Sequence, residues 1–192
     1  MTLYSNEIVF RGHPDKVCDQ ISDALLTEYL KGDENSRCGI EVAGGKGVIF
    51  ITGEVTSKAD VNVKEVVERT LFDIGYQDEM EIIDNIGHQS PDIALGVDVD
   101  GAGDQGMMFG YACNETPELM PMPVMLSHKI LLKAAELRKS GAIKWLRPDS
   151  KSQVTIEYEN NKPVRIDTVV VSHQHDDNVS YDEIKKTIIE QI

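Results

Sequence analysis

The sequence has little of what disulfide-rich and zinc-binding proteins need. It contains three cysteines among 192 residues, and no two of them have C-x-x-C spacing. Neither a disulfide framework nor a structural zinc site is therefore expected. We predict that the thiols of Cys18, Cys38 and Cys113 are buried structural groups in a protein of the reducing cytoplasm.

Long apolar runs are missing as well. No run is long enough to cross a bilayer, and the first residues lack the basic region, apolar stretch and cleavage site of a secretory signal. Basic residues are few: 19 lysines and arginines stand against 33 acidic residues, for a net charge of −14. Such a surface repels phosphates, so neither nucleic acid nor a membrane is an expected partner. A polyanionic substrate would need metal ions or locally clustered basic residues to bind.

Helix and strand patterns alternate along the chain, which predicts a mixed α and β fold. A first helix is expected from Pro14, with proline at the first helical position, to a cap at Gly32. A second helix is expected over residues 62–74, and Asn62 and Glu65 give it a capping-box-like start. The apolar residues of the first helix recur at four-residue spacing and should form one buried face: Val17, Ile21, Leu25 and Tyr29.

Two more helices are predicted in the second half of the chain. One follows Pro121 and Pro123 and ends at Gly141, and the other begins with a capping box of Ser180 and Glu183. The apolar stripe of the first is Leu126, Ile130, Ala134 and Leu137. That of the second is Ile184, Ile188 and Ile192.

The strand patterns fall into two hairpins. One is expected within residues 37–56 around a glycine-rich turn, and the other within residues 152–172 around an ENNK turn. Residues 84–106 are rich in glycine, aspartate, serine and proline, and we expect functional loops there around a short element. We predict a further strand over residues 107–113.

The segment GHPDK, residues 12–16, places an imidazole and a carboxylate at the start of the first helix. The free N–H groups and the positive end of the helix dipole favour phosphate there. His13 could donate a hydrogen bond to a phosphate oxygen, and Asp15 is a hard oxygen ligand of the kind that Mg²⁺ prefers. The alternative, which composition alone favours, is that both side chains merely cap the helix.

Other polar residues also have two interpretations. Glu41 and Glu54 lie in neighbouring strands, where each is an outward-facing acid, one member of an ion pair, or a group that binds a cation. Gln89 and Asp104 belong to the segments HQSPDI and GAGDQG. The glycines there permit either a close approach to a ligand or a tight structural turn.

The segment RPDSKSQVT places Arg147, Asp149 and Lys151 just before a strand. Its basic groups could meet phosphate, and Asp149 could accept from a ribose hydroxyl or an amine; exposed surface charge is the alternative. His173 and His175 share one strand face at the end of the second hairpin. We favour exposed polar residues over a metal site for them, because no acidic or thiol ligand has suitable spacing.

In their order along the chain, these segments closely resemble the methionine adenosyltransferase (S-adenosylmethionine synthetase) family. The matching strings span essentially the whole chain: GHPDK, TGEVTS, IGHQSPDI, GAGDQGMMFGYACNET, LMPMP and WLRPDSKSQVT. The resemblance implies an α+β fold of repeated α/β domains, with mostly antiparallel or mixed sheets and helices on one face. Residues 13–98 would form a first domain, and residues 1–12 with 107–192 most of a second. A third domain would be absent from this chain.

The resemblance also implies a reaction. Enzymes of this family join ATP and L-methionine, with Mg²⁺ and K⁺ as cofactors. The methionine sulfur attacks the ribose C5′ and expels the triphosphate, which is then hydrolysed to pyrophosphate and phosphate. Because sulfur is already a good nucleophile, catalysis consists of positioning and of stabilising the leaving group.

Matching motif by motif assigns the site residues. Those expected to bind ATP are His13, Asp149, Ser150 and Lys151. Those expected to bind methionine are Glu54, Gln89 and Asp104. The gate over the active site would include Gln89, Asp98 and Gly101. His13 and Lys151 would be the catalytic groups at the triphosphate, Asp15 would bind Mg²⁺ and Glu41 would bind K⁺.

The sequence departs from the family pattern in three ways. Arg11 stands where the family usually has glutamate, the stretches 75–87 and 89–103 are shorter than is common, and the family's C-terminal portion with its glycine-rich phosphate loop is missing. We therefore predict part of an oligomeric enzyme that needs a second subunit or a complementary C-terminal chain for turnover. The alternative is a non-catalytic regulatory or binding subunit of a larger synthetase.

Overall fold

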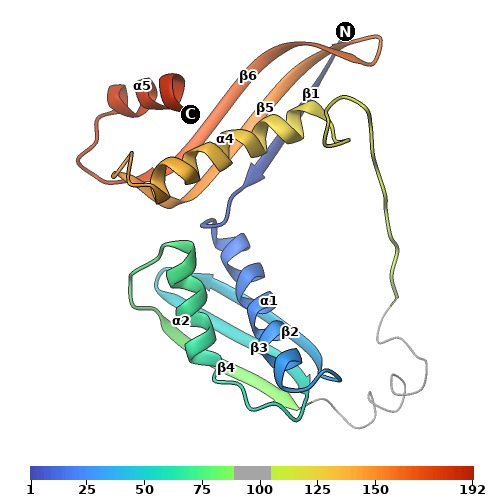
Figure 1. Cartoon of the computed structure of the whole chain (residues 1–192), viewed down its shortest axis with the longest axis vertical. Coiled ribbons are helices and arrows are strands. Elements are labelled where there is room, and N and C mark those ends of the chain that lie inside the picture. Colours follow the sequence, from blue (N-terminus) through green and yellow to red (C-terminus); the bar gives the residue numbers. More distant parts are fainter. Residues whose placement is uncertain (89–104) are drawn as a thin grey trace. The chain divides into compact units, whose positions relative to one another are not determined.

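The computed structural model describes residues 1–88 and 105–192 (Figure 1). These residues form four helices and six strands. They divide into two compact units, which we name after their longest helices. The α1 unit is Pro14–Phe109, and the α4 unit is Met1–His13 together with Gly110–Ile192.

In the α1 unit, two helices pack on one face of a three-stranded sheet (Figure 1). The helices are α1 (Pro14–Gly32) and α2 (Val63–Ile74). Strands β2 (Arg37–Gly45) and β3 (Val48–Thr56) are antiparallel, whereas β4 (Glu81–His88) runs parallel to β3. The core lies between helices and sheet, and its most deeply buried members include Ile21, Leu25, Ile51 and Val67.

Local sequence signals account for most of this unit. Helix α1 has the predicted bounds, and all four residues of its predicted apolar face are buried. At the start of α2, Asn62 Oδ1 accepts a hydrogen bond from the Glu65 backbone N–H at 3.2 Å. The β2–β3 turn consists of Lys46 and Gly47, with φ values of 52° and 85°. Positive φ at both positions is typical of a two-residue type I′ hairpin turn, so this hairpin is confirmed.

Strand β4 lies partly in residues 84–106, where the prediction was functional loops around a short element. The structure instead has a continuous strand from Glu81 to His88. Asp84, Asn85 and Gly87 have low strand propensity, so the segment has a loop-like composition. Its conformation is fixed by parallel pairing with β3, which no local pattern reveals.

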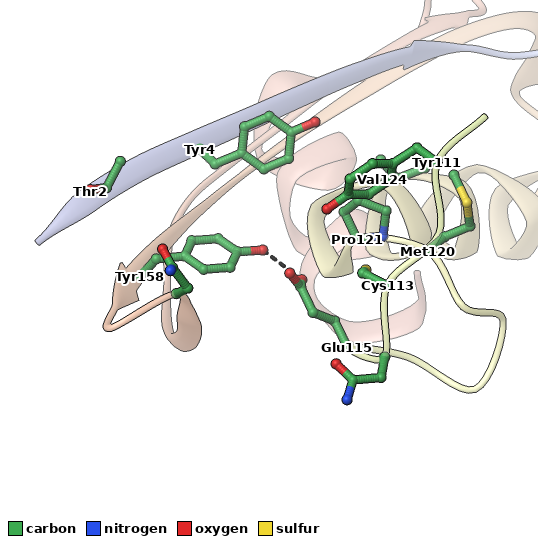
Figure 2. Close-up of a pocket in the computed structure, with 11 residues that line it drawn as sticks. Thr2, Tyr4, Tyr111, Cys113, Glu115, Met120, Pro121, Val124 and Tyr158 are labelled. Carbon is green, nitrogen blue, oxygen red and sulfur yellow. Dashed lines mark hydrogen bonds between the residues drawn. The ribbon is translucent and has the colours of Figure 1, made fainter. Parts of the chain in front are cut away.

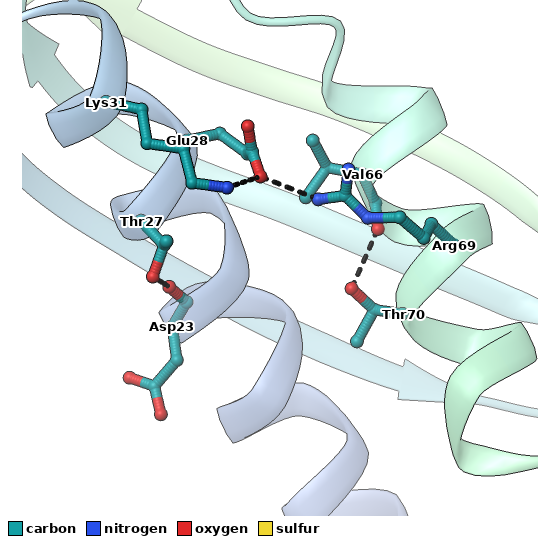
Figure 3. Close-up of polar contacts among 7 residues, drawn as sticks. All are labelled: Asp23, Thr27, Glu28, Lys31, Val66, Arg69 and Thr70. Atoms are coloured by element: carbon teal, nitrogen blue, oxygen red, sulfur yellow. Dashed lines mark hydrogen bonds and ion pairs between the residues drawn. The ribbon is translucent and has the colours of Figure 1, made fainter.

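An ion-pair group joins α1 to α2 on their exposed side (Figure 3). Glu28 Oε1 accepts from the Arg69 guanidinium at 2.7 Å and from the Lys31 ammonium at 2.9 Å. Both hydrogen bonds lower the pKa of the Glu28 carboxyl. Nearby, Thr27 and Thr70 each donate to the carbonyl four residues earlier in their own helix. The group therefore links the two helices above the apolar core.

The α4 unit is built on an antiparallel sheet in the order β1-β5-β6. Its strands are β1 (Thr2–Val9), β5 (Leu146–Glu159) and β6 (Lys162–His175). Helix α4 (Met122–Lys139) lies along one face of the sheet, and α5 (Tyr181–Gln191) follows β6 (Figure 1).

The turns and caps of the α4 unit follow the predicted chemistry. The β5–β6 turn is Asn160 and Asn161, with φ values of 50° and 60°, so this hairpin is also confirmed. Its first strand starts earlier than predicted, and Arg147, Asp149 and Lys151 lie within β5, not before it. Ser180 Oγ accepts from the Glu183 N–H at 3.2 Å, which confirms the predicted helix start. The predicted α+β class with antiparallel and mixed sheets is confirmed as well.

The predicted apolar stripe of α4 was largely wrong. The residues that are buried on this helix are Pro123, Ser127, Leu131 and Ala134. Ser127 is fully buried, with its Oγ 2.8 Å from the Pro123 carbonyl oxygen and 3.1 Å from that of Asn6. The Ser127 carbonyl accepts from Ser152 Oγ at 2.8 Å. The helix therefore packs on the sheet through the small polar residue Ser127. The predicted stripe residues Leu126, Ile130 and Leu137 are only partly buried.

The strand predicted over residues 107–113 was also wrong. No strand of the described residues pairs with this segment. Met107, Met108, Phe109 and Tyr111 are exposed. The apolar composition suggested a strand, but a strand needs a partner for its backbone groups.

Candidate functional site

Two predicted motifs meet in the α4 unit. Strand β1 pairs with β5 up to Val9 and Lys151, and the Phe10 N–H then donates to the Ser150 carbonyl at 2.9 Å. The chain turns here, because the His13 N–H donates back to the Phe10 carbonyl at 2.9 Å. His13, at the beginning of the GHPDK motif, therefore follows directly on the strand pair that contains Ser150 and Lys151.

Gly12 sets how closely this turn approaches β5. A Cβ at Gly12 would lie 2.2 Å from the carbonyl carbon and oxygen of Pro148, and 2.7 Å from the Asp149 nitrogen. Real Cβ atoms essentially never come within 3.0 Å of such atoms. Only glycine lets the turn pack against the Pro148–Asp149 peptide. The structure thus brings the backbones of all four residues predicted to bind ATP into one region: His13, Asp149, Ser150 and Lys151. Ser150 is buried, however, and strand alternation points its side chain to the face opposite that of Lys151.

Lys151 gives this cluster one cationic group, beside the carboxylates of Asp149 and Glu7. Lys151 Nζ lies 3.7 Å from Glu7 Oε1, and both side chains are almost half exposed. Such an exposed pair is worth about 0.5 kcal/mol, so Lys151 can exchange Glu7 for a phosphate at little cost. Arg147, which the sequence also indicated as a possible phosphate-binding residue, instead forms an ion pair with Asp176.

The neighbouring strand β6 supports the cluster. The Asp149 N–H donates to Gln174 Oε1 at 3.4 Å, and His173 pairs with Ser150 across the ladder. Burial lowers the pKa of the His173 imidazole, and Arg138 lowers it further, while the Gln174 carbonyl and Asp149 act in the opposite direction. His173 is therefore largely neutral near pH 7.

Sequence reasoning missed the supporting residues Glu7, Gly12 and Gln174. Glu7 lies between Asn6 and Ile8 in β1, and an exposed acid in a strand does not by itself indicate which side chain it pairs with. The glycine of GHPDK was visible, but its need for close packing depends on Pro148, far along the chain. No local signal would have identified Gln174 as a partner of Asp149.

The α1 unit holds a second set of predicted residues. Glu41 pairs with Thr52, and Glu54 pairs with Gly39. Strand alternation places both carboxylates on the face opposite the helices, as diagonal neighbours with Cβ atoms roughly 7 Å apart. Both are exposed, and Thr52 between them accepts from Asn85 Nδ2 at 3.3 Å. This face therefore presents several side-chain oxygen atoms of the kind that bind cations.

Asp15 lies in the first turn of α1 and is exposed. An acid there is stabilised by the positive end of the helix dipole. Burial raises the pKa of the Cys18 thiol, and the negative charge of Asp15 raises it further. The thiol is therefore protonated near pH 7. The three thiols are free, and each is half-buried.

Four predicted residues lie outside the described residues: Gln89, Asp98, Gly101 and Asp104. Within residues 1–88 and 105–192, no group of three or more histidine, cysteine or acidic side chains is arranged to hold a metal ion. The Nδ1 atoms of His173 and His175 each lie 2.9 Å from the carbonyl oxygen of the following residue. No helix of the described residues is long and apolar enough to span a membrane.

Comparison with known proteins covers almost the whole chain. Residues 1–91 match the N-terminal domain of S-adenosylmethionine synthetase, and residues 99–192 match its central domain. An S-adenosylmethionine synthase of Treponema denticola is 47% identical over 209 residues, which cover 100% of this chain and 54% of the relative. S-adenosylmethionine synthases of Syntrophobacter fumaroxidans and Clostridium tetani are 46% and 45% identical, over 99% of this chain and 53% and 54% of their own lengths. The chain spans about half the length of the curated relatives it matches.

Proposed function

Because the chain belongs to the S-adenosylmethionine synthetase family, we propose that it is the N-terminal and central part of an enzyme that forms S-adenosylmethionine from ATP and L-methionine. The observation that carries the proposal is the packing of the Gly12 turn against the Pro148–Asp149 peptide. This contact joins two family motifs from opposite ends of the chain into one cluster with an imidazole and an ammonium group. The proposed compartment is the cytoplasm.

In the proposed reaction the methionine sulfur forms a bond to the ribose C5′, and the bond from C5′ to the triphosphate oxygen breaks. One water then hydrolyses tripolyphosphate to pyrophosphate and phosphate. Negative charge develops on the leaving oxygen, so groups that donate hydrogen bonds or carry positive charge there lower the barrier. We assign that role to His13 and Lys151, and we assign Asp149 and Ser150 to holding ATP beside them.

The α1 unit would supply cation and methionine ligands. Glu54, with Gln89 and Asp104, would hold the amino and carboxylate ends of methionine, and Gln89, Asp98 and Gly101 would belong to the gate. Glu41 would bind K⁺ on a face where Thr52 and Asn85 add oxygen atoms.

Asp15 would bind Mg²⁺. This metal is usually bound through one or two carboxylates together with substrate phosphates and water. The exposed carboxylate of Asp15 is compatible with that way of binding. When bound, Mg²⁺ would neutralise phosphate charge in this acidic protein.

Turnover would need residues beyond this chain. The relatives are about twice as long, and the proposed partner is a second subunit or a complementary chain that corresponds to their C-terminal half. An assay should therefore combine this chain with the C-terminal half of the Treponema denticola relative and measure S-adenosylmethionine formation.

Calorimetric titration of this chain with ATP and Mg²⁺ tests the site directly. We expect Lys151→Ala to weaken binding about tenfold, because the loss of a charge-assisted phosphate contact is worth about 1.5 kcal/mol. Lys162→Ala, an exposed lysine at the far end of the β5–β6 hairpin, is the matched control and should bind like the parent chain. In the reconstituted assay, His13→Ala should abolish turnover while the chain stays folded.

Two outcomes would count against the proposal. If the chain binds neither ATP nor methionine but still associates with a full-length synthetase, it is a non-catalytic subunit. If Lys151→Ala and Lys162→Ala weaken ATP binding equally, the loss of affinity comes from the change in the net charge of the protein. The cluster around Lys151 is then not a phosphate site.

A further inference from the structure

A cavity of about 700 Å³ lies in the α4 unit, away from the proposed ATP cluster. One wall is formed by Tyr4 of β1 and Tyr158 of β5, and the opposite wall by Tyr111, Glu115 and the first turn of α4 (Figure 2). None of its lining residues belongs to the ATP, methionine or metal assignments above.

Strand register separates this cavity from the ATP cluster. Thr2 pairs with Tyr158 at the cavity end of the sheet, and Val9 pairs with Lys151 at the other end. Seven residues of extended strand span roughly 23 Å. A ligand in the cavity would therefore not occupy the ATP cluster.

The cavity combines aromatic rings with one carboxylate. The Tyr158 hydroxyl donates to Glu115 Oε2 at 2.7 Å, and the Met122 N–H at the start of α4 donates to the same oxygen at 2.9 Å. Both hydrogen bonds hold the carboxylate in place, and Oε1 can accept a further bond. Burial and the hydrogen bond to Glu115 raise the pKa of Tyr158, so its ring stays a neutral phenol.

The rings are arranged to present their faces. Tyr4 and Tyr158 meet edge to face, with centroids 6.4 Å apart and planes at 68°. Perpendicular rings form a corner in which a ligand can touch an aromatic face, and such faces attract cations. Tyr111 approaches from the opposite wall and is largely exposed, so it can adjust to a ligand.

The charge balance of the cavity is negative. The described residues that line it include no lysine, arginine or histidine, and Glu115 is their only charged member. The N-terminus of α4 contributes roughly half a positive charge, which the carboxylate exceeds. A ligand that matches this environment carries positive charge and has an apolar body.

We propose that this cavity binds a small organic onium cation, either a methylated ammonium or a sulfonium, with its charge near Glu115 and its methyl groups against the faces of Tyr4, Tyr111 and Tyr158. The proposal is independent of the proposed function, because it uses none of the residues assigned to the reaction. A methylated onium ion suits the cavity better than a primary amine, since it spreads its charge over carbon atoms that pack on rings.

Choline and trimethylsulfonium chloride are suitable probes, titrated into the full chain and followed by amide chemical shifts in two-dimensional NMR spectra. The neutral comparison is 3,3-dimethyl-1-butanol, which has the shape of choline without its charge. We expect saturable shifts around residues 111–124 and 158 with choline, and at least fivefold weaker binding of the neutral alcohol. The sulfonium arm shows whether the cavity accepts both kinds of onium centre or prefers one.

Two variants test the assigned residues. Glu115→Gln keeps an oxygen that can accept from Tyr158 and Met122, and it should weaken choline binding about tenfold through the lost charge. Glu118→Gln is the matched control, because Glu118 is a nearby exposed acid that pairs with Lys129 and does not line the cavity. It should leave choline binding unchanged.

Tyr111→Leu provides a second test that does not depend on the Glu115 contacts. This side chain is largely exposed, so its replacement should not affect folding, yet it should weaken choline binding several-fold. The proposal is overturned if choline and its neutral analogue bind equally well. It is also overturned if Glu115→Gln and Glu118→Gln have the same effect, if Tyr111→Leu leaves the affinity unchanged, or if the shifts centre on residues 149–151.

Discussion

Replacing Gly12 with alanine should separate the His13 turn from strand β5. The added Cβ would lie 2.2 Å from the Pro148 carbonyl carbon and oxygen, whereas ordinary contacts begin near 3.4 Å. The backbone would therefore have to move by about 1.2 Å, because the obstructing atoms belong to the main chain and cannot rotate away. Two hydrogen bonds flank this contact, from Phe10 to Ser150 and from His13 to Phe10, and the movement strains both.

The expected cost follows from these contacts. Overpacking of a well-packed site costs about 2 kcal/mol, and one weakened backbone hydrogen bond adds about 1 kcal/mol. We therefore expect Gly12→Ala to lower the free energy of unfolding by about 3 kcal/mol. If His13 acts on ATP as proposed, a displacement near 1 Å should also reduce turnover of the reconstituted enzyme about 100-fold.

Urea denaturation of the chain measures the first effect, and the reconstituted assay measures the second. Gly45→Ala is the control, because a Cβ at Gly45 would meet nothing within 4 Å. Its free energy of unfolding should stay within about 0.5 kcal/mol of the parent value. If Gly12→Ala is as stable as Gly45→Ala, the turn does not depend on close packing, and the argument that it positions His13 is wrong.

Two further predictions concern stability. Burial lowers the pKa of His173, so between about pH 7.5 and 5.5 the unfolded chain takes up a proton that the folded chain resists. The free energy of unfolding should therefore fall as the pH falls through this range. Urea titrations should show a smaller loss for His173→Gln than for the parent chain, and an equal loss in both proteins would refute the assignment. Arg69→Ala removes the link from α2 to Glu28 and should lower the free energy of unfolding more than Lys64→Ala does, with a smaller loss in 1 M salt than in low salt, because the pair is partly exposed. Lys64→Ala, which removes an exposed pair within α2, should change it by less than about 0.3 kcal/mol, and an equal effect of the two substitutions would show that Glu28 and Arg69 do not hold the helices together.

Some features of this protein were determined by the sequence alone, because their causes lie within a few residues. The cap at Asn62, the positive-φ turns at residues 46–47 and 160–161, and the buried face of α1 all follow from neighbours in the chain. The series of motifs identified the family for the same reason, since each string is contiguous.

Other features were decided only by the tertiary structure. Strand β4 and the buried face of α4 depend on partners far away in sequence, so local composition misassigned both. The packing of Gly12 on Pro148, and the cavity that Tyr4 forms with Glu115 and Tyr158, bring residues of the N-terminal segment next to residues more than a hundred positions away. A sequence pattern records which side chains are polar or apolar, but the distance between two segments is set by how the whole sheet and its covering helix pack.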